Sequence, residues 1–398
     1  MKNKINNKIF NPFLAFLKSE SSSGLILLIC AVIAIIIANS SFATTYDNIL
    51  HTYVTIGYKE ISLSMSVLHW INDGLMAIFF FVVGMEIKRE LVIGELKSLK
   101  RTILPVSAAL GGMIVPAIIY VLFNYKGATI TGWGIPMATD IAFALGILAL
   151  VGKKAPKGIV VFLTALAIVD DLGAIIVIAI FYTSQIYWSA FFIGLAIFCI
   201  LILANKFKIK FTSIFIIGGI LLWICFLKSG IHATIAGVLL GMVLPVGKNM
   251  NEFKESILYK LEHTLTPWSS FVIMPIFALA NSGIKIDINS FSTLIFTPVS
   301  LGIIFGLFVG KQVGIFGVSY ILIKLNIAKL PSQVTKNHLY GASVLGGIGF
   351  TMSLFVSSLS FSDETILSTA KISIMVASIL SAILGIIIFK FINPQIEK

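Results

Sequence analysis

The chain has 398 residues, of which 58% are hydrophobic and 12% charged, with a mean hydropathy of +1.02. Soluble domains carry about a quarter charged residues, so this composition excludes an ordinary soluble domain, a disordered chain and a secreted disulfide scaffold. The net charge of +12 comes without any basic patch interleaved with aromatic residues, so we expect no nucleic-acid partner.

Twelve apolar segments follow one another, most of them close to the roughly 20 residues that a membrane-spanning helix needs. They are residues 19–38, 66–88, 102–123, 130–151, 158–182, 189–205, 212–226, 230–244, 257–280, 299–322, 338–360 and 368–391. No compositional break or soluble insertion separates them. We therefore expect residues 1–398 to form a single polytopic transmembrane domain, all-α, with about twelve transmembrane helices.

The basic residues predict the orientation, because cytoplasmic loops carry an excess of Lys and Arg. With the N-terminus in the cytoplasm, five of the 29 basic residues lie outside and Lys311 lies inside a span. The five are Lys59, Lys126, Lys228, Lys285 and Lys371. All others are cytoplasmic, which predicts a multi-pass membrane protein with both termini inside. A cleavable signal peptide at the first segment is an alternative, but its removal would leave an odd number of spans.

The connection between the first two segments breaks the helical pattern. Its sequence YVTIGYKEISLS alternates polar and apolar residues around Gly57 and Tyr58. The pattern is typical of a short external β-hairpin, and an irregular loop fits equally well.

Several ionisable residues lie inside the predicted spans, where a charge costs about 2.5–3.5 kcal/mol or more at the bilayer centre. They are Asp140, Asp170, Asp171 and Lys311, with Asp73 and Glu86 nearer the ends of the second span. One such carboxylate could be a structural hydrogen-bond anchor. Three carboxylates and a lysine near mid-span favour a functional site.

Asp170 and Asp171 are adjacent, so they project about 100° apart on a helix. They therefore cannot face each other as the carboxylates of a protease dyad do. One can line a cavity while the other points toward a neighbouring helix. A carboxylate held away from water is satisfied by either a proton or a small hard cation such as Na⁺, which prefers oxygen ligands.

Two predicted spans contain helix-weakening residues next to polar ones. Gly132, Gly134 and Pro136 precede Thr139 and Asp140 in the fourth span. Pro136 weakens the helix there because Pro removes a backbone donor and clashes with the preceding turn. Gly346, Gly347 and Gly349 precede Thr351 in the eleventh span. Each run alone fits a kink or close helix packing. Two runs in separate halves of the chain favour paired broken helices around a transport site.

Lys311 has no other basic residue near it in the tenth span. An ion pair with Asp170 or Asp140 would stabilise it, although its side chain could instead reach the membrane surface. A second charged group is expected on the cytoplasmic side. Its members are Glu86, Arg89, Glu90, Glu262 and His263, which form either a solvated rim or an ion funnel that titrates near neutral pH.

Six motifs together resemble the bacterial NhaA Na⁺/H⁺ antiporter family. They are WINDGLMAIFFFVVGMEIKREL, GWGIPMATDIAFALG, ALAIVDDLGAI, SGIHATIAG, LEHTLTPW and GIGFTMSLF. They stand in the order of the family, and the resemblance covers essentially the whole chain.

The resemblance implies inverted repeats formed by spans three to five and ten to twelve, with two broken helices crossing at mid-membrane. It implies that Asp170 and Asp171 carry protons or Na⁺/Li⁺, with Thr139 close to the cation. Asp140 and Lys311 would compensate the helix ends at the crossing. The remaining implied roles are the ion access path for Asp73 and pH sensing for Glu86, Arg89, Glu90, Glu262, His263 and His232. The hairpin would contribute to a homodimer.

These features predict a secondary transporter that exports Na⁺ or Li⁺ in exchange for protons. We expect it to be electrogenic, pH-activated and not an enzyme, to use alternating access, and to need no cofactor beyond the transported ions. A membrane aspartyl protease would need facing carboxylates and a GxGD motif. A cation channel would need a repeated filter, and the sequence holds none of these.

Overall fold

The computed structural model describes residues 20–58, 61–151, 155–183, 185–247, 249–285 and 293–391. Within these ranges the chain is mostly helical, and its only sheet has two strands. Lys59, which we expect outside the cell, is not among the described residues.

The first half of the chain contains five of the predicted spans and the hairpin. Its elements are α2 (Glu20–Ala38), α3 (Ala43–His51), β1 (Tyr53–Tyr58), β2 (Ile61–Ser66), α4 (Val67–His69), η1 (Trp70–Leu75), α5 (Met76–Val92), η2 (Glu95–Lys97), α6 (Leu99–Phe123), η3 (Ala128–Met137), α7 (Ile141–Val151) and α8 (Lys157–Phe181). α2 and α3 meet at 112°, so α3 turns away from the line of the first span.

The second half contains the other seven spans. Its elements are α9 (Trp188–Lys206), α10 (Thr212–Ser229), α11 (Thr234–Val243), α12 (Met250–Glu255), α13 (Ile257–Trp268), η4 (Ser269–Ile273), α14 (Met274–Asn281), α16 (Pro298–Phe305), η5 (Gly306–Gly310), η6 (Val313–Gly317), α17 (Val318–Lys324), α18 (Lys336–Leu345), α19 (Phe350–Ser360) and α20 (Glu364–Phe391). The π-helical turns η1, η4, η5 and η6 were not predicted from the sequence. π-turns occur frequently at functional sites.

The predicted number of spans agrees with the structure. Eight described helices are long and apolar enough to cross a membrane, and three bent pairs would each count as one further span. The shorter apolar helix α11 covers the remaining predicted segment. An all-α membrane protein with about twelve spans is therefore confirmed.

The connection between the first two spans is a β-hairpin, which decides between the two interpretations of its sequence. β1 pairs antiparallel with β2, from Tyr53 opposite Ser66 to Tyr58 opposite Ile61. Gly57 has φ 131°, a conformation that residues with a Cβ rarely adopt. The hairpin is held to the helices below it by Trp70, whose indole N–H donates to Val54 O at 3.0 Å.

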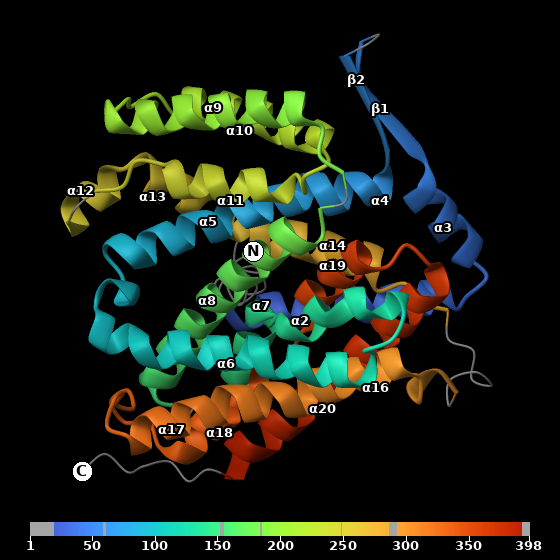
Figure 1. Cartoon of the computed structure of the whole chain (residues 1–398), viewed down its shortest axis with the longest axis vertical. Coiled ribbons are helices and arrows are strands. Elements are labelled where there is room, and N and C mark those ends of the chain that lie inside the picture. The colour runs from blue at the N-terminus through green and yellow to red at the C-terminus, as the bar shows by residue number, and fades with distance from the viewer. Residues whose placement is uncertain are drawn as a thin grey trace, which may run out of the picture.

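The helices pack in two groups that meet along α8 and α19. Figure 1 shows α9, α10, α11 and α5 on the side of the hairpin, and α6, α16, α17, α18 and α20 on the opposite side. α11 packs along α5 and α10 along α9 in the first group, and α6 packs against α8 and α16 against α20 in the second. The fourth and fifth spans, which carry Asp140, Asp170 and Asp171, thus lie between the two groups.

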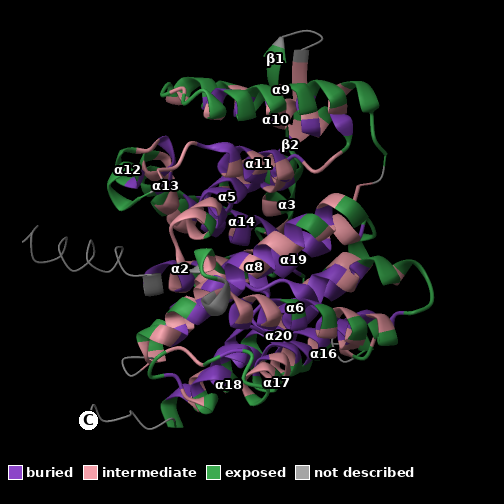
Figure 2. Cartoon of the chain, turned by 60° about the vertical axis from the view of Figure 1, so that its left-hand side comes forward, coloured by how far each residue is buried: buried purple, intermediate pink, exposed green. Residues whose placement is uncertain are grey.

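Burial follows this arrangement. In Figure 2 the buried residues concentrate on the inner helices, among them α8, α19, α5 and α11, whereas α9 and α10 are largely exposed. The exposed residues of α9 and α10 include large apolar side chains such as Phe192, Ile217 and Ile220. Such a surface is expected of helices that face lipid, because the hydrocarbon core of the bilayer offers no hydrogen-bond partners to polar side chains.

Candidate functional site

Both predicted helix breaks exist, and they lie against each other. η3 and α7 differ in direction by 41° across the break at Ala138–Asp140, and α18 and α19 by 42° across Gly346–Gly349. The Asp140 amide donates to Ile348 O at 2.7 Å, which joins the two breaks directly. Ser353 Oγ donates to Ile135 O at 2.8 Å, so a side chain satisfies a carbonyl that the broken helix leaves free.

Asp140 accepts hydrogen bonds from the N-termini of two half-helices. Its Oδ1 accepts from the Phe143 amide in α7 at 3.0 Å, and its Oδ2 accepts from the Thr351 amide in α19 at 3.1 Å. The Thr351 hydroxyl also donates to Asp140 Oδ2. Helix N-termini carry partial positive charge. One buried carboxylate therefore offsets the positive ends of both half-helices at this crossing.

Asp170 lies in the middle of α8 and pairs with Lys311, not with solvent. Lys311 Nζ donates to Asp170 Oδ2, and both side chains are fully buried. The second oxygen, Oδ1, is also buried and accepts no hydrogen bond from the described residues. Asp170 thus has one neutralised oxygen and one oxygen available to a further ligand.

Thr139 connects the carboxylate to the second break. Its Oγ1 lies 2.6 Å from Asp170 Oδ2 and 2.9 Å from Gly346 O. A hydroxyl has one proton to donate and two lone pairs to offer, so it donates to one of these oxygens at a time. The hydroxyl can then donate its proton in a hydrogen bond to one neighbour while a lone pair of its oxygen serves as a cation ligand.

Asp171 is 5% exposed and has no hydrogen bond or ion pair with any described residue. Asp170, Glu86, Asp140 and Lys311 are close enough to its carboxylate to interact electrostatically. Three of these four are acidic, so the site has an excess of negative charge. A buried carboxylate without a partner is costly, which a bound proton or cation would relieve.

The position of Lys311 depends on close packing between α6 and the tenth span. Lys311 follows η5 and precedes η6, so two π-turns flank it. Gly111 and Gly314 let the two backbones approach so closely that a Cβ on either would contact the other's carbonyl oxygen. A Cβ on Gly112 would stand 2.8 Å from Ile315 and 3.6 Å from the Lys311 stem. Small residues thus make the space through which the lysine reaches α8.

The charged residues that the sequence predicts on the cytoplasmic side include an ion-pair cluster. Arg89 in α5 forms an ion pair with Glu262 in α13, and its Nη2 lies 3.1 Å from Glu90 Oε1. Glu86, one turn earlier in α5, is close enough to Arg89 to interact electrostatically. His263 packs its ring 5.8 Å from that of Tyr259, on the same helix as Glu262.

Asp73 and His232 lie apart from that cluster. Asp73 is in η1, where its carbonyl accepts a hydrogen bond from Trp223 Nε1 at 3.0 Å. His69 and His232 are close enough to its carboxylate to interact electrostatically. The His232 ring forms a hydrogen bond with Tyr182 O, with 2.9 Å between Nε2 and the oxygen. The predicted residues therefore gather at three places, and nothing described joins His232 to the Arg89 cluster.

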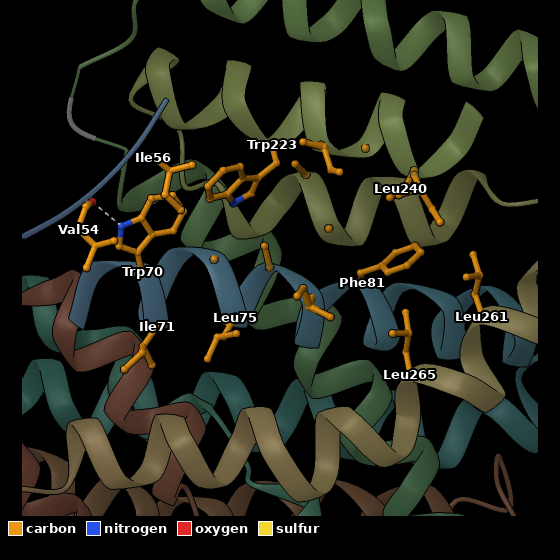
Figure 3. A pocket seen from close by; sticks show the side chains of 18 of the residues that line it. Val54, Ile56, Trp70, Ile71, Leu75, Phe81, Trp223, Leu240, Leu261 and Leu265 are labelled. Carbon is orange, nitrogen blue, oxygen red and sulfur yellow. Dashed lines mark hydrogen bonds between the residues drawn. The ribbon is translucent and has the colours of Figure 1, made fainter. Parts of the chain in front are cut away.

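A large groove elsewhere does not fit an ion site. Figure 3 shows apolar side chains, among them Trp70, Phe81, Trp223 and Leu240, around a hollow of about 770 Å³. Its lining contains no charged residue, so it offers a cation no anionic ligand. Ion chemistry is therefore expected at the crossing.

The sequence did not predict the contact that Thr351 makes. Thr351 was recognised as following the second Gly run, but its contact with Asp140 spans 211 positions of the chain. No signal in a single sequence marks which distant backbone a hydroxyl group will meet.

Comparisons with known proteins agree with this architecture. The model of a family described as Na⁺/H⁺ antiporter 1 matches residues 14–389. The chain is 76% identical over 398 residues to "Na(+)/H(+) antiporter NhaA 1" of Clostridium beijerinckii, covering all of both chains. It is 48% identical to "Na(+)/H(+) antiporter NhaA" of Pelagibacter ubique, covering 96% of this chain and 98% of that one.

One solved structure supports the fold. The sodium proton antiporter MjNhaP1 from Methanocaldococcus jannaschii superposes with a TM-score of 0.56, at 16% identity, over 92% of each chain. At that identity the likeness concerns the fold alone.

Proposed function

The chain belongs to the Na⁺/H⁺ antiporter 1 family, and we propose that it exports Na⁺ from the cell in exchange for protons entering down their gradient. It is a transporter and not an enzyme. The observation that carries the proposal is the buried pair of carboxylates in α8. Asp170 is held by Lys311 and Thr139, whereas Asp171 lacks any described partner.

Exchange follows from competition for these carboxylates. The cation would bind between Asp171 and the free oxygen of Asp170, with Thr139 Oγ1 as a further ligand. Carboxylate and hydroxyl oxygens suit hard cations such as Na⁺ and Li⁺. A proton on Asp171 removes the charge that the cation needs, so the two ions exclude each other from the site.

Two protons would leave for each cation that binds. Asp171 gives up one, and Asp170 or its partner Lys311 gives up the other. Each transport cycle then moves one Na⁺ out of the cell and two protons into it. The net movement of one positive charge makes the exchange electrogenic. No cofactor besides the transported ions takes part.

Alternating access would use the two broken helices. In the inward-facing state the low proton concentration of the cytoplasm leaves the carboxylates ionised, so Na⁺ binds. In the outward-facing state protons displace it. Because each broken span consists of two rigid halves, a tilt of the halves at Thr139 and Gly346 can open one side while the other closes.

Flux in reconstituted vesicles tests this function. With the vesicle interior more acidic than the medium, ²²Na⁺ should accumulate inside, and a protonophore should abolish the accumulation. An imposed voltage, positive inside, should accelerate uptake because net positive charge leaves. Na⁺ uptake that is independent of the proton gradient would instead indicate a channel. An uptake rate that is independent of voltage would exclude electrogenic exchange.

The Arg89 cluster is our candidate for pH activation. Glu262 is 5% exposed, and its ion pair with Arg89 ties α13 to α5. Protonation of Glu262 would break this tie, so the activity would depend on pH, and Glu86, Glu90 and His263 would belong to the same pH-sensing cluster.

Replacing Glu262 with Gln should shift the pH profile of exchange and leave the maximal rate unchanged. The amide keeps the shape of the side chain but cannot titrate. Initial rates of Na⁺ exchange from pH 6 to pH 9 measure the effect, with Glu255→Gln, an exposed carboxylate on α12, as the control. An unchanged profile for Glu262→Gln would remove it from the pH response.

The remaining assignments are part of the same proposal. Asp73, with His232 beside it, would lie on the access path from the outside. The hairpin β1–β2 would contribute to a homodimer in the bacterial inner membrane. Both termini would be cytoplasmic, as the distribution of Lys and Arg indicates.

A further inference from the structure

The outer half of the fourth span is an unusual helix. η3 runs for ten residues as a 3₁₀-helix, whereas runs beyond three or four residues are uncommon because their hydrogen-bond geometry is poor. Two tyrosine hydroxyls bond to its backbone. Tyr120 Oη in α6 donates to Thr129 O at 2.7 Å, and Tyr182 Oη donates to Thr131 O at 2.7 Å.

The Tyr182 hydroxyl bonds to η3 twice. Besides donating to Thr131 O, it accepts from the Gly134 amide at 3.2 Å. We call these two hydrogen bonds the outer contact. Tyr182 directly follows α8, the helix that carries Asp170 and Asp171, so the outer contact ties the outer end of that helix to the broken span.

The packing around the outer contact is close. A Cβ on Gly134 would stand 2.7 Å from Tyr182 Oη, so any other residue there would displace the hydroxyl. Trp133 packs edge-on against Phe181 with ring centroids 5.0 Å apart. The Thr131 hydroxyl also donates to Ser360 O at 3.1 Å, which brings the end of α19 to the same point.

A hollow lies at this place. A cavity of about 560 Å³ is lined by residues of α6, η3, α8 and α19, including Thr131, Trp133, Tyr182 and Ser360. Unlike the groove of Figure 3, its lining includes hydroxyl groups. It lies at the end of the spans that the distribution of Lys and Arg assigns to the outside. Water in such a cavity could solvate Thr131 O and the Gly134 amide once the tyrosine leaves them.

We propose that Tyr182 is a positioning residue whose outer contact keeps η3 against α8 and closes the outer route to Asp170 and Asp171. This inference rests on the proposed function, because it concerns the outward-facing step of exchange. Ions leave to the outside only after both hydrogen bonds of the outer contact open. The hydroxyl thus sets how often the outward-facing state forms.

Tyr182→Phe keeps the ring and removes the outer contact. The loss of two hydrogen bonds, partly replaced by water, should raise the outward-facing population about tenfold. A ligand's apparent affinity rises with the population of the state that binds it. The KM for Na⁺ offered from the outside should therefore fall about tenfold, with a smaller change in the maximal rate.

Labelling of a buried cysteine reports the opening directly. In a variant with Cys30, Cys199 and Cys225 replaced by Ser, Met137→Cys places a thiol in η3 where the native side chain is 6% exposed. A membrane-impermeant thiol reagent added from the outside should label it about tenfold faster with Tyr182→Phe. The matched control is Tyr187→Phe, an exposed tyrosine without a described hydroxyl partner, which should change nothing.

Three results would overturn the inference. They are an unchanged labelling rate, an unchanged KM, and labelling that becomes faster from both sides, which would mean general loosening. If Tyr182→Phe does not fold, Gly134→Ala tests the same contact, since its Cβ displaces the hydroxyl, and it should act in the same direction. Absence of Na⁺/H⁺ exchange in the unmodified protein would contradict the proposed function itself, which the labelling experiment does not measure.

Discussion

Asp171→Asn should abolish Na⁺/H⁺ exchange in vesicles while the protein remains folded. The side chain is 5% exposed and has no described hydrogen bond, so the amide replaces the carboxylate without breaking a contact. An amide can neither release a proton at physiological pH nor balance the charge of Na⁺. Uptake of ²²Na⁺ driven by a proton gradient should fall to the level of protein-free vesicles.

The matched control for this experiment is Asp47→Asn. Asp47 is an exposed carboxylate on α3, next to His51, and lies outside the proposed ion site. Its variant should exchange Na⁺ at the unmodified rate. Normal exchange by Asp171→Asn would show that α8 does not bind the cation through this carboxylate, and the competition mechanism would then be wrong.

The second large effect concerns stability. Lys311→Met should lower the free energy of unfolding by about 3–5 kcal/mol, because it leaves the fully buried Asp170 carboxylate without its counter-charge. The double variant Asp170→Asn/Lys311→Met should recover most of this loss, since neither remaining side chain is charged. Thermal unfolding of the purified protein in detergent at fixed pH measures the effect.

Lys324→Met is the control for Lys311→Met. Lys324 is exposed at the end of α17, so its replacement should leave the melting temperature unchanged. A double variant that melts no higher than Lys311→Met alone would contradict the pairing of Lys311 with Asp170. In that case the lysine stabilises the protein through packing of its stem against Gly112 and Ile315.

The sequence predicted most of the fold because the membrane imposes strict local rules. A spanning helix must be apolar over about 20 residues, so each predicted span could be found from its own residues. The breaks were predicted by the same kind of evidence. Gly132, Gly134 and Pro136 weaken the helix where they stand, and the structure has a 3₁₀-helix there. The sequence did not decide between a hairpin and an irregular loop after the first span, since the alternating pattern fits both.

The π-turns could not be predicted from the sequence. Four of them occur in the second, ninth and tenth spans, and two flank Lys311. Their sequences, such as Gly306–Gly310, are ordinary for a membrane helix. A π-turn forms where packing against neighbouring helices outweighs the weaker hydrogen bonds, so its position depends on residues elsewhere in the chain.

By itself, the sequence determined the class of the protein, its spans and which residues are too polar for their place in the membrane. Only the tertiary structure decided how those residues pair. Lys311 could have joined Asp170 or Asp140, and it joins Asp170, 141 positions away, while Asp140 takes the two helix N-termini. The physical reason is that the hydropathy of a span depends only on residues that are adjacent in the sequence. An ion pair depends on how closely helices distant in the chain approach each other, here through Gly111, Gly112 and Gly314.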